Sequence, residues 1–412
     1  MRTQQGMRTS RSGRNTLKNI IRLIPAIVIM AAVLNTVSCG NNNGLLPQDN
    51  GGGGSNSPTA TPTGGSGALA FVTNFNDGKV SSFTRNPNSG VLKRTGQVTA
   101  GAKKGPKGVV AAPSGSFLYV ANNSDDNIYE FSVNQTNGAL TPLSPASISN
   151  GAGSGPDEIA INPAGTFLWV TGAKKGTVTP YSVNSSTGQL TQVTTKVTGL
   201  VKPFGIAADT SGSFVYVADN GAGLVYSYSI GASGALTQIG SPVFDLGSAG
   251  GTPGFIAIDP AGTFIYVTDL NAGVLSVIQT TAGALLFGSI VPSTTTGNVP
   301  IGIGYAALSS GNFIFTANQA SSSLWSFLIT VPGFASSPVA FGTGNLSAPT
   351  GLVVDPQNAF LYTTNQNAGT VSQFSLSPTC SAAPGPPCFV GNVATENPAN
   401  ANSGPFGMAL AQ

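Results

Sequence analysis

A short segment that begins with an aromatic residue and runs on through Val or Thr to Asn, Asp or Gly returns seven times along this chain. Its copies begin at Phe71, Tyr119, Trp169, Tyr216, Tyr266, Phe315 and Tyr362, so successive copies lie 47 to 50 residues apart. A period near 50 with several short apolar runs per unit is typical of propeller blades. The spacing therefore predicts an all-β fold: a seven-bladed β-propeller with four antiparallel strands per blade.

The unit from Thr252 to Val277 shows how the strands of one blade are separated. Its apolar runs are short and lie between turn-forming residues: Phe255 to Ile258, then Asp259-Pro260-Ala261-Gly262, then Phe264 to Thr268, then Asn271-Ala272-Gly273, then Val274 to Ile278. Apolar runs of this length between Pro, Gly, Asn and Asp indicate strands rather than helices.

The first unit lacks an opening strand of its own, because only a Gly/Ser-rich run precedes Phe71. The segment from Gly404 to Leu410 matches the opening segment from Gly105 to Ala111. We therefore expect the C-terminal strand to complete the first blade and so to remove an open sheet edge. The propeller is expected to span residues 68–412.

The first 39 residues are predicted to be a lipoprotein-type signal peptide. Six basic residues within the first 22 positions precede an apolar run of 12 residues from Leu23 to Leu34, which is too short to span a bilayer. Small residues follow and end at Cys39. Residues 40–67 are rich in Gly, Asn, Ser, Thr and Pro and are expected to be a flexible linker.

Cys39 is the expected site of lipidation, because the segment Thr36-Val37-Ser38-Cys39-Gly40 resembles a bacterial lipobox with Thr36 where Leu is usual. The alternatives are an ordinary cleaved signal and an uncleaved anchor. The expected location is the cell envelope, with the exported chain held on a membrane through Cys39.

The other two cysteines, Cys380 and Cys388, lie eight residues apart around a Pro/Gly-rich loop. Such a pair in an oxidising compartment suits a disulfide. The alternative is two free thiols.

Charged residues are few and unevenly distributed. Removing the six basic residues of the first 22 positions leaves 11 of 17 against 14 acidic residues, a formal charge of −3, and no Lys or Arg follows Lys202. A nucleic-acid partner requires a basic face, so we expect none. The sequence contains no His and no metal-ligand spacing, so neither a metal nor a cofactor is expected. We expect a monomer.

In a propeller, the loops between blades and those between second and third strands share one face, here called the top face. The charged residues expected there are Lys103, Lys104, Asp125, Asp126, Lys174, Lys175, Lys202, Asp219 and Asp269. Asp209, Asp259 and Asp355 end first strands and are expected to form turns on the opposite, bottom face.

The residue after each opening Pro should ring the channel mouth. Around the ring it is Lys107, Asp157, Phe204, Gly254, Ile301, Thr350 and Phe406. Glu158 follows Asp157 where most units have Gly. The charged residues on one side and the apolar residues on the other suit a small-molecule pocket. The alternative is that Lys107 and Asp157 form only a surface ion pair of little consequence.

The repeats resemble the YVTN-type seven-bladed propellers of the lactonase family, which includes 6-phosphogluconolactonase and the muconate-lactonising cycloisomerase. The resemblance rests on four patterns that recur through the units: Pro-x-Gly, Asp-Pro-x-Gly, Tyr-Val-Thr-Asp and Thr-Gly-x-Leu. It implies a propeller fold. Enzymatic members of the family use His, Arg and Glu near the channel, whereas this chain has no His and its only Arg residues beyond the signal are Arg85 and Arg94.

We therefore expect an exported module that binds a small molecule or a protein through its top face, with Lys107, Asp157, Glu158, Phe204 and Phe406 as ligand-binding residues. The alternative is a lactonase-like hydrolase that acts on a sugar lactone or a related lactone, in which Glu158 is the catalytic base. The sequence has no Gly-x-Ser-x-Gly segment that would supply a serine nucleophile.

Overall fold

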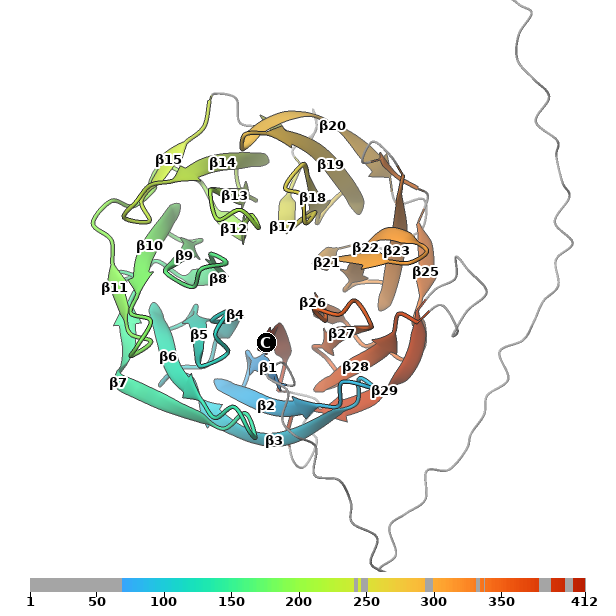
Figure 1. Cartoon of the computed structure of the whole chain (residues 1–412), viewed down its shortest axis with the longest axis horizontal. Coiled ribbons are helices and arrows are strands. Elements are labelled where there is room, and N and C mark those ends of the chain that lie inside the picture. The colour runs from blue at the N-terminus through green and yellow to red at the C-terminus, as the bar shows by residue number, and fades with distance from the viewer. Residues whose placement is uncertain are drawn as a thin grey trace, which may run out of the picture. The chain divides into compact units, whose positions relative to one another are not determined.

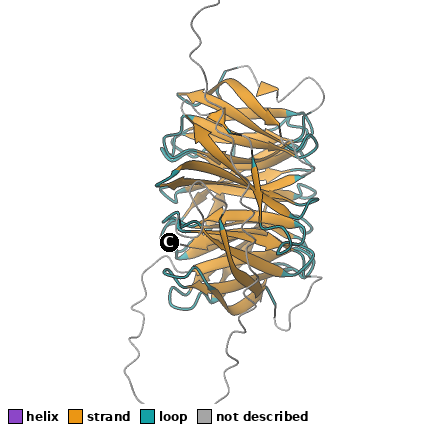
Figure 2. Cartoon of the chain, turned by 90° about the vertical axis from the view of Figure 1, so that its right-hand side faces the viewer, coloured by secondary structure: helices purple, strands orange, loops and turns teal. Residues whose placement is uncertain are grey.

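A computed structural model describes residues 69–240, 244–245, 251–292, 299–330, 334–336, 338–377, 387–396 and 403–411. Within these ranges the strands form seven sheets arranged as blades around a common centre (Figure 1). The blades seen from the side have their loops on two opposite faces (Figure 2). The predicted seven-bladed fold is confirmed. No helix in the described residues is long and apolar enough to cross a membrane.

The innermost strand of each blade lies at the channel. From the innermost strand outward, the first three blades contain β30 (Pro405–Ala411), β1 (Leu69–Asn74), β2 (Lys79–Arg85) and β3 (Leu92–Thr99); β4 (Pro106–Ala111), β5 (Phe117–Asn122), β6 (Asn127–Val133) and β7 (Leu140–Ser149); β8 (Pro156–Ile161), β9 (Phe167–Gly172), β10 (Thr177–Val183) and β11 (Leu190–Gln192).

The remaining four blades follow the same plan, with short extra strands in two of them. They contain β12 (Pro203–Ala208), β13 (Phe214–Asp219), β14 (Leu224–Ile230), β15 (Leu236–Gln238) and β16 (Phe244–Asp245); β17 (Pro253–Ile258), β18 (Phe264–Asp269), β19 (Val274–Thr281) and β20 (Ala284–Pro292); β21 (Pro300–Leu308), β22 (Gly311–Asn318), β23 (Ser323–Thr330), β24 (Phe334–Ala335) and β25 (Val339–Phe341); β26 (Pro349–Val354), β27 (Phe360–Asn365), β28 (Thr370–Ser375) and β29 (Cys388–Ala394).

The C-terminal strand closes the ring. β30 pairs antiparallel with β1 from Leu69 opposite Ala411 to Asn74 opposite Pro405. The first blade therefore takes its innermost strand from one end of the described chain and its other three strands from the opposite end. The predicted circular closure is confirmed.

The repeated aromatic residue joins each blade to the next one. The Tyr119 hydroxyl donates to the Gly188 carbonyl at 2.7 Å, and the Trp169 indole N–H donates to the Gly234 carbonyl at 2.9 Å. These rings are fully buried, and the glycines lie in the turns before the outer strands of the following blades. A buried aromatic side chain with a polar end thus packs between two blades and satisfies a carbonyl that water cannot reach.

The hydrophobic core is divided among the blade interfaces. In one cluster Leu69 and Phe71 of the first blade pack with Leu118 and Val120 of the second, and similar clusters join the other neighbouring blades. Side chains of successive strand residues point to opposite faces of a blade, so each blade contributes to two clusters. The packing holds the innermost strands around the channel.

The bottom-face turns are built by their aspartates, as predicted. Asp259 Oδ1 accepts hydrogen bonds from the backbone N–H groups of Thr263 at 2.7 Å and Phe264 at 2.8 Å. Asp209 and Asp355 accept equivalent bonds within their own turns. Their carboxylates are thus engaged in turn formation.

A buried ion pair adds to the joint between the seventh and first blades. Arg85 Nη1 lies 2.9 Å from Asp355 Oδ2, and the two side chains are 2% and 1% exposed. Arg85 Nη2 also donates to Gln357 Oε1 at 3.2 Å. This joint is therefore held by charge as well as by packing.

Candidate functional site

The channel mouth brings together residues from four innermost strands, β4, β8, β12 and β30. Lys107 follows the opening Pro of β4 and Asp157 follows that of β8, and Lys107 Nζ lies 2.6 Å from Asp157 Oδ1. The Lys107 side chain is 19% exposed and the Asp157 side chain 3%. The ion pair that the alternative predicts is thus present, but its carboxylate lies inside the protein and not at the surface.

Three phenyl rings surround the Lys107 ammonium. Nζ lies 5.9 Å from the ring centroid of Phe75, 5.8 Å from that of Phe204 and 5.6 Å from that of Phe406. Distances below about 6 Å are within the range of cation–π attraction. The predicted Lys107, Asp157, Phe204 and Phe406 are thus brought together. Phe75 was not predicted, because it follows β1 at a position without a repeat pattern.

Burial shifts the pKa of the acid in this pair. Burial raises the pKa of Asp157, and the nearby Lys107 ammonium opposes part of that rise. The ion pair therefore offsets some of the desolvation of the carboxylate.

Glycines follow the mouth residues in five of the seven blades, and we call this level of the channel the neck. There the innermost strands of adjacent blades lie close together. A Cβ at Gly108, Gly205, Gly302, Gly351 or Gly407 would meet a backbone carbonyl oxygen of the next blade at 2.2 to 2.6 Å. Side chains cannot be accommodated at that distance without a backbone shift. Glycine is therefore required at these five positions for adjacent innermost strands to approach one another.

Two blades depart from this glycine pattern and place side chains in the channel. Glu158 on β8 and Phe255 on β17 both line a cavity of about 120 Å³ with residues of the other innermost strands, among them Val109, Ile303, Leu352, Phe406 and Met408. We call this cavity the chamber. Phe255 was missed at the sequence level, although comparison of the third residue of each Pro-x-Gly pattern reveals it.

Glu158 is an unusual acid because most of its surroundings in the chamber are apolar. Burial raises its pKa to about 8, the negative charge of Asp157 adds to the rise, and Lys107 opposes it. Glu158 is therefore mostly a neutral carboxylic acid at pH 7, able to donate a hydrogen bond, and becomes a carboxylate above pH 8.

The other predicted ring positions serve packing. Thr350 is fully buried and its hydroxyl lies 2.8 Å from that of Thr364. Ile301 is also buried. The Phe204 ring packs edge-on against Phe255 at 5.0 Å between centroids, which links the mouth to the chamber wall.

The described arginines lie away from the channel. Arg85 is in the bottom-face ion pair, and Arg94 on the outer strand β3 donates to the Thr395 carbonyl at 2.9 Å. Across the part of the chain that the structure describes, no group of three or more His, Cys, Asp or Glu side chains is placed to hold a metal.

Two predicted sites concern the cysteines. Cys39 and Cys380 lie outside the described residues, and Cys388 begins β29. The lipidation of Cys39 and the disulfide between Cys380 and Cys388 therefore stay predictions.

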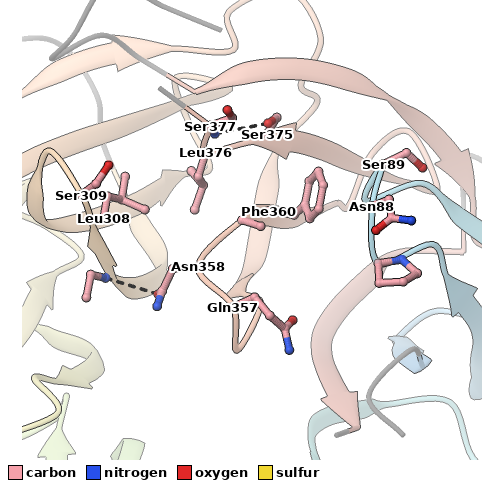
Figure 3. A pocket seen from close by; sticks show the side chains of 13 residues that line it. Asn88, Ser89, Leu308, Ser309, Gln357, Asn358, Phe360, Ser375, Leu376 and Ser377 are labelled. Atoms are coloured by element: carbon pink, nitrogen blue, oxygen red, sulfur yellow. Dashed lines mark hydrogen bonds between the residues drawn. The ribbon is translucent and has the colours of Figure 1, made fainter. Parts of the chain in front are cut away.

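A larger cavity of about 710 Å³ lies on the bottom face, away from the channel (Figure 3). Turns of the first, sixth and seventh blades line it, and Asn358 Oδ1 crosses from the seventh blade to accept from the Ala307 N–H at 3.3 Å. Its described lining contains amides, hydroxyls and apolar groups but no charged side chain. It offers neither an acid nor a base for chemistry.

The sequence matches the model of the family described as Lactonase, 7-bladed beta-propeller, over residues 57–204 and 201–382. No curated protein matches it. Similar solved structures include a putative 6-phosphogluconolactonase of Bacteroides fragilis, with a TM-score of 0.69 and 14% identity over 86% of this chain and 100% of that one.

A second similar structure is a periplasmic gluconolactonase of Pseudomonas aeruginosa, with a TM-score of 0.66 and 17% identity over 84% of this chain and 98% of that one. A putative 6-phosphogluconolactonase of Bacteroides uniformis has a TM-score of 0.70 and 13% identity over 84% and 100% of the two chains. At these identities the likeness shows the fold. Because the family model matches most of the chain, this protein belongs to the seven-bladed β-propeller lactonase family.

Proposed function

We propose that this propeller binds a small molecule or a group of a partner protein at the mouth of its channel. The observation that carries the proposal is the cluster around Lys107, where an ammonium, a buried carboxylate and three phenyl rings meet at one opening. Binding sites commonly combine a few convergent polar groups with apolar walls. The ligand would contact the rings and compete for hydrogen bonds with Lys107 or Asp157.

Hydrolysis is less well supported by the same geometry. The chain contains no His, and its described arginines lie far from the chamber, so the channel has neither a histidine base nor an arginine that could hold an anion. The chamber of about 120 Å³ is also smaller than the roughly 300–1,000 Å³ of typical ligand pockets. A sugar lactone would need the innermost strands or the phenyl rings to move.

A lactonase-like hydrolase is the second candidate, favoured by Glu158. This acid replaces a neck glycine, faces the chamber and has its pKa raised to about 8. A carboxyl group that titrates near the working pH can act as a general acid or base. Family membership and the similarity in fold to proteins named as lactonases support the same reading.

One set of measurements separates the two candidates. Purified protein is assayed for hydrolysis of sugar, aryl and acyl-homoserine lactones by acid release against a buffer blank, and the binding of the same lactones is measured calorimetrically. The binding proposal expects no turnover and weaker lactone binding in Lys107→Ala. Turnover that disappears in Glu158→Gln while binding survives would establish the hydrolase instead. Glu158→Gly, which restores the neck pattern, controls for loss of fold.

We also propose that the chain is exported and carries lipid on Cys39. The support is the basic region, the apolar run of 12 residues and the small residues before that cysteine. Labelling of producing cells with a fatty-acid analogue should mark the wild type and leave Cys39→Ala unmarked. Equal labelling of both would rule out lipidation at this residue.

A further inference from the structure

The top face carries a group of lysines that the channel site does not use. They belong to the loops that precede the innermost strands of the second and fourth blades and to the hairpin between β9 and β10 of the third. We call this group the lysine crescent; it consists of Lys103, Lys104, Lys174, Lys175, Lys196 and Lys202. Lys196 is partly exposed and the other five are exposed.

No carboxylate in the described residues forms an ion pair with a crescent lysine; the pairs there involve Lys79, Arg85 and Lys107. Two crescent lysines instead contact loop carbonyls. Lys174 Nζ donates to the Asn123 carbonyl at 3.3 Å, and Lys196 Nζ donates to the Asn150 carbonyl at 3.4 Å. Their charges are therefore available to a partner in solution.

The acids of this sector are occupied by the loops. Asp126 accepts from the backbone N–H groups of Gly153 at 2.7 Å and Gly155 at 2.8 Å, and Asp125 accepts from the Tyr129 hydroxyl at 2.8 Å. Asp157 is buried against Lys107. The carboxylates thus organise the backbone beneath, while the ammonium groups extend into solvent.

Three of the crescent lysines act on carboxyls of the same sector. Partial burial alone would raise the pKa of Asp126, but the N–H groups of Gly155 and Gly153 together with Lys174 and Lys103 hold it below its ordinary value. Lys202 and Lys174 likewise oppose the burial of Asp157. Lys174 therefore acts on the same carboxyls as its neighbours Lys103 and Lys202, which lie in the loops before the second and fourth blades.

The rest of the top face has the opposite character. No Lys or Arg follows Lys202 in the sequence, so the fifth, sixth and seventh blades have no basic residue. Asp219 and Asp269 are the acids of the next two hairpins, and both accept backbone hydrogen bonds. One side of the channel mouth is cationic and the other is neutral to acidic.

We propose that the lysine crescent binds a linear anionic polysaccharide, a glycan chain that carries carboxylate or sulfate groups. A chain of regularly spaced anions matches exposed point charges arranged along an arc. Lysine suits this role because its ammonium attracts any anion without the fixed bidentate geometry of arginine. Such contact is long-range, so the crescent also concentrates an anionic partner near the channel mouth.

Two other anionic partners fit the surface less well. A membrane surface is normally met by exposed aromatic or long aliphatic side chains beside the cations, whereas the large exposed apolar residue of this sector is Val201. Single-stranded nucleic acid is held by stacking on exposed aromatic rings, and the crescent consists of lysines in loops.

Full-length protein is titrated with polygalacturonate and with heparin at low and at high salt, and neutral dextran serves as the control. Both anionic glycans should bind, and added salt should weaken the binding, since exposed charges are screened. Lys174→Gln/Lys175→Gln should weaken it several-fold, and addition of Lys103→Gln/Lys104→Gln should bring the loss to about tenfold or more. Lys79→Gln/Lys93→Gln removes the same number of charges as the first pair and should change affinity less than about twofold.

The outcomes decide the proposal. Absence of binding to either anionic glycan, or equal losses in the crescent and control pairs, would overturn it. Tighter binding to phosphatidylglycerol vesicles or to oligothymidylate than to both glycans would assign the crescent to a membrane or a nucleic acid instead. Unchanged thermal unfolding of the variants shows that any loss arises from charge. The result is independent of lactone binding at the channel.

Discussion

Two blade interfaces in this ring have the same geometry but different chemistry. At the interface of the second and third blades, Tyr119 lies opposite Glu130, and Glu130 Oε2 accepts from the Leu190 N–H at 3.0 Å. At the interface of the seventh and first blades, Tyr362 lies opposite Gln373. There Gln373 Oε1 accepts from the Leu92 N–H at 2.7 Å.

The difference lies in what each interface depends on. Glu130 is buried, and burial raises its pKa to about 7, so its interface changes charge near neutral pH. Gln373 is always neutral, but its interface packs the seventh blade against the blade that β30 completes and contains the Arg85–Asp355 pair. The two interfaces therefore have the same backbone geometry, but the stability of the Glu130 interface depends on pH and that of the Gln373 interface depends on closure of the ring.

Removal of residues 404–412 should have the largest effect on this comparison. The first blade would lose its innermost strand and expose the edge of β1, so the whole ring should lose cooperative stability. Thermal unfolding measured by circular dichroism should show a melting temperature lower by ten degrees or more, at about 2–4 °C per kcal/mol. An unchanged melting temperature would contradict the observed circular pairing.

Arg85→Ala should come next. It leaves Asp355 buried without its partner, which typically costs about 3–5 kcal/mol. Urea unfolding provides the measurement, and Arg94→Ala, which removes an arginine from the outer strand β3, is the matched control. Similar losses in the two variants would show that the buried pair has no special role in closure.

Glu130→Gln should convert the pH-sensitive interface into a copy of its counterpart. Because the pKa of Glu130 is raised in the folded state from 4.5 to about 7, its contribution is fully present below pH 4.5 and is lost as the pH rises through 7. The variant should match the wild type at pH 4 and exceed it at pH 8 by up to about 3 kcal/mol.

The measurement is the free energy of unfolding in urea at several pH values, with the variant compared with the wild type at each one. Gln373→Glu is the reciprocal variant and should introduce a loss of stability at high pH. Parallel curves for wild type and Glu130→Gln would mean that Glu130 keeps its ordinary pKa in the folded protein.

Tyr119→Phe should have the smallest effect. It leaves the Gly188 carbonyl without its hydroxyl donor and should cost about 1 kcal/mol, a typical contribution for a buried hydrogen bond. The first blade already has Phe71 at this position. Phe71→Tyr is therefore the reciprocal variant. A higher urea midpoint for it would show that a hydrogen bond from this side chain to the neighbouring blade can be added at another interface.

The fold was predictable because its signals are local and repeated. The seven aromatic segments fixed the blade count, and the match between Gly404–Leu410 and Gly105–Ala111 identified the closing strand. Strands between turn-forming residues need no long-range information to be recognised. The burial of Glu130 is not predictable in this way, because it depends on the neighbouring blade.

The candidate site was predictable in part. Lys107, Asp157, Phe204 and Phe406 share one position in the repeat, so ring symmetry alone places them together. Phe75 was not predicted, because it comes from a loop outside that position. The burial of Asp157 was not predicted either, because the exposure of its side chain depends on how three rings pack over the Lys107 ammonium. Side-chain packing across blades has no periodic signature.

The neck glycines determine where the channel can change in evolution or by design. Five of seven neck positions are closed to any side chain by the carbonyl oxygen of the next blade, which leaves Glu158 and Phe255 as the two neck positions whose side chains line the chamber. Substitution of these two side chains therefore changes the chemistry of the chamber at the neck itself. The neck thus combines five positions that are restricted to glycine with two positions that carry a side chain.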